Sequence, residues 1–413
     1  MAIEQPVAPA WWEHDATLLR FVCDLVDGEL SMLRRGRVDP RLPWPGALHI
    51  GRDLGADSLE LLALATAFSD MLHVHRSGIE DYLLARLEIA DWAAIARQSL
   101  RQFSAELTFR TSGSAGSPKR CTHRLPMLWQ EVAVLAALLP GRRRILSAVP
   151  SHHIYGFLFT VLLPQAPEMG GLDVLDLRGS SPARLAQELG PGDLVVAHPE
   201  FWRAALQPQA HFPPGVIGVT SSAPCPDELA QALQAAGLDK LVQVYGSSET
   251  GGVGWRDAAA SPYQAFPYWR RVADDAAVLE RTLPGGACAR YPIQDQLEWI
   301  DADTFRPAGR IDQAVQVGGI NVFPAQVAAA LREHPGVLDA SVRLMRADEG
   351  NRLKAFVVPR AAHLDHDGLR AQLALWSRDR FDSPQRPMAF SFGSQLPRQA
   401  NGKLADWIID AAG

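Results

Sequence analysis

Residues 111–119, with the sequence TSGSAGSPK, combine small and hydroxyl-bearing side chains with a single lysine. A backbone of Gly, Ser and Ala lets several N–H groups approach a ligand closely, and the hydroxyl groups add further hydrogen-bond donors. Lys119 adds a positive charge at the end of the stretch. We therefore expect this stretch to be a loop that binds phosphate groups.

The spacing of this loop differs from that of the Walker loop, which requires G-x-x-x-x-G-K-[ST]. Pro118 stands where that pattern has its second glycine, and Arg120 stands where it needs a hydroxyl group for Mg²⁺. These differences disfavour a P-loop kinase or ATPase. A flexible Ser/Gly linker is the alternative, but such linkers seldom follow an apolar strand like the one that Leu107 and Phe109 predict.

Three further motifs carry side chains suited to a nucleotide, and the second of them combines two segments, QDQLEWID and AGRIDQAVQVGGINVFPAQV. VYGSSETGG (residues 244–252) places an aromatic ring, which could stack on a base, shortly before Glu249, a carboxylate suited to Mg²⁺. QDQLEWID contains Asp295, which could accept hydrogen bonds from ribose hydroxyls. AGRIDQAVQVGGINVFPAQV contains Arg310, which could pair with phosphate or ribose. LPRQANGKL places Lys403 ten residues from the end.

Each of these segments also has an ordinary structural interpretation. The Tyr-Gly…Glu pattern is common in turns at strand ends. Arg310 and Asp312 could form a weak surface ion pair, and Lys403 could be a solvated surface charge. The joint occurrence of the four motifs in this order is what favours a nucleotide site.

The pattern of apolar residues along the chain predicts an α/β fold with three segments, which must position these residues. Residues 1–103 are expected to be helical, because apolar residues recur there at helical spacing. In residues 104–308, short β-rich stretches such as GDLVVAHP, GVIGVTSSAP and LVQVYGSSE alternate with helices. This alternation predicts a parallel sheet, with ligands beyond the carboxyl ends of its strands. Residues 309–413 are expected to form a compact α/β domain. Its expected elements are a helix from Pro324 to Glu333, the strands LDASVRLM and LKAFVVP, a helix after Asp367 and the strand MAFSF.

Composition excludes several classes of protein. The 413 residues are 47% hydrophobic and 21% charged, as in an ordinary globular protein. The net charge of −6 argues against nucleic acid as a partner. The four cysteines have no metal-like spacing, and neither a signal peptide nor a membrane-spanning segment is visible, so we expect a cytoplasmic protein with no membrane insertion.

In this order, the four motifs resemble those of the acyl-adenylate-forming (AMP-dependent synthetase/ligase) superfamily. The resemblance covers about residues 104–413 and implies an adenylation core, a small mobile C-terminal domain, and ATP and Mg²⁺ as cofactors. The implied roles are a phosphate loop, an adenine-side turn, an adenine-stacking tyrosine with its turn, a magnesium carboxylate that is also catalytic, a ribose-binding aspartate, a catalytic arginine, a hinge and a catalytic lysine. In that order the residues are Thr111, Ser112, Gly113, Ser114, Gly116 and Lys119; Ser221, Ser222, Ala223 and Pro224; Tyr245, Gly246, Ser247 and Ser248; Glu249; Asp295; Arg310; Asp312; and Lys403.

The same resemblance suggests which residues face the acid and the thiol. In VPSHHIYGF, His153 resembles the residue that lines the family's acyl pocket, although a core histidine is an equally good interpretation. His198 and Gly251 are further candidates for the pocket, and Gly318 and Gly319 are candidates for a tunnel that admits the thiol. VGGINVFPAQV looks most like the loop of benzoate-type ligases, which implies an aromatic acid.

The leading segment departs from the family, because only about a hundred residues precede the phosphate loop and they do not read as its usual first subdomain. DLGADSLELLAL is similar to the phosphopantetheine-attachment site of acyl carrier proteins, with Ser58 in the modified position. The structural alternative is that Asp57 and Ser58 begin an ordinary helix.

Together these features predict ATP-dependent activation of a hydroxybenzoate-like acid as acyl-AMP, followed by transfer to a phosphopantetheine thiol. The short build resembles ligases of aryl-polyene pigment pathways, which implies an acyl carrier protein as the acceptor and partner. An aryl- or fatty acyl-CoA ligase that uses free coenzyme A, and a non-catalytic nucleotide-binding scaffold, remain alternatives.

Overall fold

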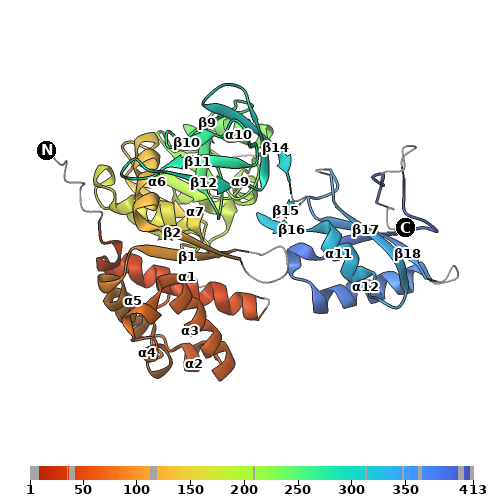
Figure 1. The fold of residues 1–413 in the computed structure, drawn as a ribbon, viewed down its shortest axis with the longest axis horizontal. Helices are drawn as coiled ribbons and strands as arrows, with labels where there is room; N and C mark the ends of the chain where they lie inside the picture. The colour runs from red at the N-terminus through yellow and green to blue at the C-terminus, as the bar shows by residue number, and fades with distance from the viewer. Residues whose placement is uncertain are drawn as a thin grey trace. The chain divides into compact units, whose positions relative to one another are not determined.

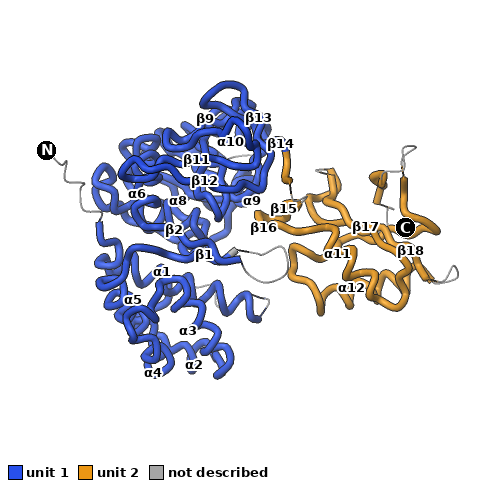
Figure 2. The backbone as a smooth tube through the Cα atoms, viewed as in Figure 1, with its two compact units in different colours: residues 1–111, 118–308 blue, residues 112–117, 309–413 orange. Residues whose placement is uncertain are grey.

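The computed structural model describes residues 9–34, 36, 42–111, 119–207, 210–311, 314–346, 348–360, 365–398 and 404–409. They form two compact units, which are coloured separately in Figure 2. The first unit contains the described part of residues 1–308, and the second contains the described part of residues 309–413. The boundary lies within a strand, β14 (Thr304–Arg310).

The first unit is organised around a nine-stranded mixed sheet with the order β13-β14-β9-β8-β7-β6-β5-β3-β4. Its parallel half pairs β4, β3, β5, β6 and β7, as the alternating pattern predicts. The strands β7, β8 and β9 then pair antiparallel. The bounds are β3 Arg144–Ser147, β4 Asp173–Asp176, β5 Leu194–Ala197, β6 Ile217–Thr220, β7 Lys240–Ser247, β8 Gly251–Arg256, β9 Tyr263–Ala265 and β13 Asp295–Trp299.

Helices and smaller sheets pack around this sheet (Figure 1). One of the helices that alternate with the parallel strands is α10 (Asp227–Ala235), which buries Leu229, Ala230 and Leu233. A hairpin of β1 and β2 carries the predicted phosphate loop, and β10, β11 and β12 form a separate sheet. The remaining bounds are β1 Glu106–Thr111, β2 Lys119–Arg124, α6 Leu125–Leu138, α7 Ile154–Phe157, α8 Leu185–Glu188, α9 Pro199–Ala205, β10 Trp269–Arg271, β11 Val278–Thr282 and β12 Cys288–Pro292.

The N-terminal helices belong to the first unit and share its core. Trp11 and Phe21 pack edge-on against Phe157, with ring centroids 5.2 and 5.7 Å apart. Phe109 of β1 packs against the same ring at 5.4 Å. Residues 9–103, predicted as a separate helical segment, are therefore continuous with the core around the sheet. The helices are α1 Asp15–Leu33, α2 Ile50–Asp53, α3 Ser58–Leu72, α4 Tyr82–Ala85 and α5 Ile89–Gln102.

The second unit has a three-stranded sheet with the order β17-β18-β19 and its own core. A short hairpin of β15 and β16 precedes it. The helices and strands fall where the sequence predicts them. Their bounds are β15 Val315–Val317, β16 Ile320–Val322, α11 Pro324–Leu331, β17 Val337–Leu344, β18 Leu353–Pro359, α12 His366–Arg380 and β19 Pro387–Phe392.

A buried lysine ties the C-terminal tail to this sheet. The ammonium group of Lys354, on β18, has no solvent exposure and lies 2.8 Å from Glu349 Oε2 and 3.0 Å from Asp406 Oδ1. It also donates to the carbonyl oxygen of Trp407 at 2.7 Å. A buried ammonium group is tolerated only when carboxylates and carbonyls surround it. These contacts fix the tail just after residue 403.

None of the described helices is both long and apolar enough to cross a membrane. All four cysteines are free thiols, three of them buried.

Replacing Lys354 with Ala should destabilise the second unit, because it leaves Glu349 and Asp406 without their buried cation. Removing one partner of a buried pair costs about 3–5 kcal/mol. We expect hydrogen exchange to accelerate in β18 and in residues 404–409. Asp367→Ala, which removes an exposed ion pair with Arg370 in the same unit, is the matched control and should change stability by less than about 1 kcal/mol. Equal effects of the two substitutions would contradict the assignment.

Candidate functional site

The phosphate-loop motif connects the two strands of a hairpin. β1 and β2 pair antiparallel, with Thr111 opposite Lys119. Leu107 and Phe109 are buried, which confirms the strand predicted before the loop and anchors the hairpin in the core. Ser112, Gly113, Ser114 and Gly116 lie outside the described residues, as does the side chain of Thr111.

The predicted loop lysine and the predicted magnesium carboxylate lie against each other. Lys119 Nζ is 2.7 Å from Glu249 Oε1, although the two residues are 130 positions apart in the sequence. Burial pushes the pKa of Glu249 upward, but the hydrogen bond and charge of Lys119 outweigh burial and hold the pKa below its usual value. The carboxylate is therefore ionised at neutral pH.

This carboxylate suits Mg²⁺ that arrives with a nucleotide. Mg²⁺ is usually held by one or two carboxylates together with substrate phosphates. Glu249 is such a carboxylate, with 28% of its side chain exposed. Among the described residues, no group of three or more His, Cys, Asp and Glu side chains could hold a metal by itself. Glu249 would therefore hold the ion together with the phosphate oxygens, and Lys119 would contact the phosphates.

The turn that carries Glu249 is held from inside by hydrogen bonds. The hydroxyl of Ser247 accepts hydrogen bonds from the backbone N–H groups of Glu249 and Thr250, both at 3.2 Å. The Nε2 atom of buried His123, on β2, lies 2.7 Å from the carbonyl oxygen of Ser248. Burial lowers the pKa of His123, so the ring is neutral and donates this bond from Nε2. The turn and the hairpin are thus joined twice, through His123 and through Lys119.

The residues predicted to bind adenine and ribose also meet. The phenol of Tyr245 donates a hydrogen bond to Asp295 Oδ2 at 2.5 Å. The hydroxyl of Ser221 donates to the carbonyl oxygen of Val244 at 2.8 Å, which ties the turn after β6 to β7. Ser222 adopts φ +73°, a left-handed conformation that fits a tight turn. Ala223 and Pro224 continue this turn toward α10; Ala223 is half-buried and Pro224 is exposed.

The glycines after Glu249 leave room for a buried carboxyl group. Glu131, on α6, is buried, and its Oε1 accepts a hydrogen bond from the backbone N–H of Gly252 at 2.8 Å. A Cβ atom on Gly251, which has φ +71°, would lie 2.6 Å from Glu131 Oε2. A Cβ atom on Gly246 would lie 2.3 Å from the carbonyl oxygen of Gly251. The pattern VYGSSETGG is therefore required partly by packing, because larger residues would collide with Glu131 or with the adjoining strand.

Glu131 and His123 are two residues of this site that the motifs did not reveal. Burial raises the pKa of Glu131 to about 7, although Arg281 nearby opposes the shift. Within the part of the chain that the structure describes, Glu131 Oε2 has no hydrogen-bond partner. The only signal in the sequence was a glutamate on the apolar face of a helix, and the contact with Gly252 depends on the tertiary fold.

The acid-side candidates lie beyond the carboxyl ends of neighbouring strands, where the alternating pattern predicts ligands. His153 follows β3 and is solvent-exposed. His198 follows β5, and its Nδ1 accepts a hydrogen bond from the backbone N–H of Phe201 at 3.2 Å, which caps α9. His198 therefore has a structural role as the cap of α9. Gly251, the third candidate for the acid pocket, lies against Glu131.

The remaining predicted residues belong to the second unit or to its edge. Arg310 ends β14. Gly318 and Gly319 form the two-residue turn between β15 and β16, with φ +59° and +78°, values that glycine adopts without strain. Asp312 and Lys403 lie outside the described residues. Among the described residues nearby, Arg398 bridges to Leu404, and Arg343 donates to the Leu404 carbonyl oxygen at 2.6 Å.

Ser58 is exposed at the first position of α3. Asp57 caps this helix: its Oδ1 accepts hydrogen bonds from the N–H groups of Leu59 and Glu60, and Glu60 bonds back to the N–H of Asp57. The structural interpretation of this motif as a helix N-terminus is confirmed. Phosphopantetheine attachment at Ser58 stays a prediction.

With this geometry in place, comparison with known proteins decides the family. The sequence profile for "AMP-binding enzyme" matches residues 104–273, and that for "AMP-binding enzyme C-terminal domain" matches residues 326–403. This chain belongs to the AMP-binding enzyme family. It is therefore an AMP-forming ligase that uses ATP and Mg²⁺, as the four motifs implied.

Relatives align over nearly the whole chain. A 4-coumarate–CoA ligase of Halorhodospira halophila is 37% identical over 394 residues, covering 94% of this chain and 98% of the relative. Another, of Rhodobacter capsulatus, is 40% identical over 386 residues, covering 91% and 96%. Among solved structures, the o-succinylbenzoate CoA synthetase of Bacillus subtilis superposes with a TM-score of 0.57 at 18% identity, covering 72% of this chain and 67% of that one. This structural similarity supports the fold alone.

Glu131→Gln should remove a pH dependence of stability. An acid whose pKa is raised to about 7 in the folded protein, from 4.5, binds its proton more tightly there than in the unfolded chain. The wild type therefore loses stability as pH rises through this window, and the Gln variant does not. From pH 5 to pH 8 the free energy of unfolding should shift in favour of Glu131→Gln by roughly 2–3 kcal/mol.

Denaturant unfolding at both pH values measures this shift. Glu298→Gln, at an exposed position of β13 in the same unit, is the matched control and should show no such trend. A difference between wild type and Glu131→Gln that is the same at both pH values would rule out a titrating Glu131.

Proposed function

We propose that this enzyme activates a planar, hydroxylated aromatic carboxylic acid with ATP and transfers it to a phosphopantetheine thiol. In the first step a carboxylate oxygen attacks the α-phosphorus of ATP, an acyl-AMP anhydride forms and pyrophosphate leaves. In the second step a thiolate attacks the acyl carbonyl carbon, the thioester forms and AMP leaves. Hydroxybenzoate-like and hydroxycinnamate-like acids are the substrate class.

One observation carries the proposal. Proteins named 4-coumarate–CoA ligase are 37% and 40% identical to this chain over almost their full length. The site geometry supports it, because Lys119 lies against Glu249 and Tyr245 bonds to Asp295. A benzoate–CoA ligase of Thauera aromatica is also similar, at 30% identity over 40% of this chain.

Each predicted site residue would have a role in adenylation that its side chain suits. Negative charge accumulates on phosphate oxygens during adenylation, so positioned cations supply much of the catalysis. Lys119 would bind the outer phosphates, and Glu249 would hold the metal that neutralises them. Tyr245 would stack on the adenine and Asp295 would accept ribose hydroxyls. Lys403 would bridge the acid and the α-phosphate.

The molecule that carries the acceptor thiol is a separate part of the proposal. Free coenzyme A and a holo acyl carrier protein present the same phosphopantetheine thiol. The names of the relatives favour coenzyme A, whereas the carrier-like motif at Ser58 and the short build suggested a carrier protein. We also propose a cytoplasmic location, because all four cysteines are free thiols.

Acid-dependent ATP–pyrophosphate exchange tests the function directly. A panel of hydroxycinnamates, hydroxybenzoates and fatty acids should give exchange with the aromatic acids. Thioester formation is then compared with coenzyme A and with a holo carrier protein. Exchange with fatty acids alone would favour a fatty-acid ligase, and no exchange with any acid would favour a nucleotide-binding scaffold.

Lys403→Ala should lower the rate of adenylation at least about a hundredfold, because it removes the cation proposed to neutralise the reacting phosphate. Thioester formation from preformed acyl-AMP should be spared. Lys240→Ala, which removes a lysine that bonds to Leu138 at the start of β7, is the control and should leave both steps intact. Equal loss of both half-reactions in Lys403→Ala would refute this division of labour.

Ser58→Ala should leave adenylation unchanged, because the cap of α3 is made by Asp57 and Glu60. Coexpression of the wild type with a phosphopantetheinyl transferase, followed by intact-mass measurement, tests modification. A protein that never gains the mass of the arm has no attachment site at Ser58.

A further inference from the structure

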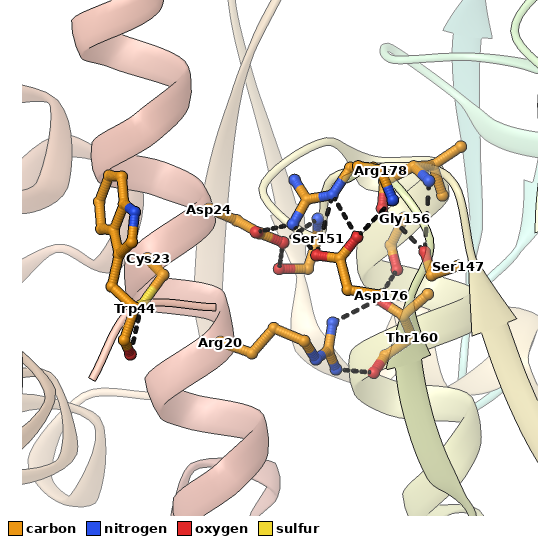
Figure 3. Close-up of polar contacts among 11 residues, drawn as sticks. Arg20, Cys23, Asp24, Trp44, Ser147, Ser151, Gly156, Thr160, Asp176 and Arg178 are labelled. Carbon is orange, nitrogen blue, oxygen red and sulfur yellow. Dashed lines mark hydrogen bonds and ion pairs between the residues drawn. The ribbon is translucent and has the colours of Figure 1, made fainter. Parts of the chain in front are cut away.

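Helix α1 contacts the loop that carries the acid-side histidines. The carboxylate of Asp24 is buried, and its Oδ2 accepts hydrogen bonds from the backbone N–H and the hydroxyl of Ser151, at 2.7 and 2.5 Å. Ser151 directly precedes His152 and His153. Figure 3 shows Asp24 reaching from α1 to Ser151 and to Arg178, which follows β4. The start of this loop is therefore held by a residue of the N-terminal segment.

The surrounding charges are balanced, so the contact is a stable one. Arg178 pairs with both Asp24 and Asp176. Arg20, one helical turn before Asp24, donates to the hydroxyl of Thr160 at 3.0 Å and to its carbonyl oxygen. The buried carboxylate of Asp24 and the half-buried carboxylate of Asp176 thus share the half-buried guanidinium group of Arg178, and buried Arg20 lies one turn away on α1. A buried network of this kind fixes geometry, because breaking any member leaves an uncompensated charge.

Gly28, one turn further along α1, lies directly against His152. A Cβ atom at position 28 would lie 2.4 Å from both Cε1 and Nε2 of the His152 ring. Glycine within a helix costs about 0.5–1 kcal/mol relative to alanine, and the close approach of the ring explains its presence. The rings of His152 and His153 lie 4.3 Å apart between centroids. A displacement of the first ring would therefore be passed to the second.

The next residue of α1 contacts the phosphate side of the site. Glu29 accepts two hydrogen bonds from Arg110 Nη1, at 3.1 and 3.0 Å. Arg110 lies one residue before Thr111, where the phosphate loop begins. Burial raises the pKa of Glu29, and the charge of Arg110 opposes this shift. Consecutive residues of one helix thus contact the acid-side loop and the base of the phosphate hairpin.

We propose that α1 is a positioning element of the acid pocket, in which Gly28 sets the place of His152 and, through it, of His153. Asp24 and Arg178 hold the loop so that the fit between Gly28 and His152 is maintained. The inference rests on the proposed function, since it takes the loop around His153 as the acid side. It gives the N-terminal segment a part in substrate selection.

Kinetics of the exchange reaction, with separate KM values for the acid and for ATP, test the inference. Gly28→Ala adds one methyl group against His152 and should raise the KM for the aromatic acid about tenfold, the scale on which one methylene changes discrimination in an apolar pocket. The KM for ATP should change by less than about twofold. Alanine favours a helix by about 0.5–1 kcal/mol over glycine, which offsets part of the cost of displacing the His152 ring.

A double-mutant cycle with His152→Ala locates the effect. If Gly28 acts through the His152 ring, adding Gly28→Ala to His152→Ala should leave the KM for the acid unchanged. Met32→Ala, at an exposed position of α1, is the control and should behave as wild type. Each variant is checked by its melting temperature.

Two outcomes would overturn the inference. One is an equal rise of the KM values for acid and ATP in Gly28→Ala. The other is an effect of Gly28→Ala that persists undiminished without the His152 ring. Absence of exchange in the wild type with every acid would refute the proposed function, and it is distinguishable from both.

Discussion

The turns that carry several candidate ligand-binding groups in the first unit depend on one constraint, which is that parallel strands end at the same edge of their sheet. The turns after β3, β5, β6 and β7 carry Ser151 to His153, His198, Ser221 and Glu249. Because these turns share an edge, groups from distant parts of the sequence come within hydrogen-bond distance. The ion pair between Lys119 and Glu249, at 2.7 Å, joins the turn after β7 to a separate element. A hairpin outside the sheet supplies its cation.

Contacts from three separate parts of the first unit hold the turn around Glu249 in place. Ser247 bonds within the turn, His123 reaches it from the hairpin, and Glu131 supports it from below. A metal-binding carboxylate must keep its position while its charge environment changes, and several independent contacts give that rigidity. The glycines beside Glu249 are needed because Glu131 occupies the space that side chains would fill.

The N-terminal helices are part of the first unit and of its core. Their aromatic residues pack with Phe109 and Phe157, which lie beside the phosphate hairpin and the acid-side loop. Asp24 and Glu29 then make polar contacts with those same two regions. A segment that resembles a carrier protein in sequence thus contributes to the core of the first unit, and Asp57 and Glu60 cap the helix that begins at Ser58.

The sequence by itself determined the α/β architecture, the strand that precedes the phosphate loop, the elements of the second unit and the family. These features follow from local patterns: alternating apolar runs, helix caps, glycine turns and motif spacing. The tertiary structure decided which polar groups touch, including Lys119 with Glu249, Tyr245 with Asp295, and Gly28 with His152. It also revealed the buried Glu131 and the network around Asp24. Such contacts join residues roughly 50 to 150 positions apart, so no local pattern encodes them. They exist only because the sheet and the N-terminal helices close around one core.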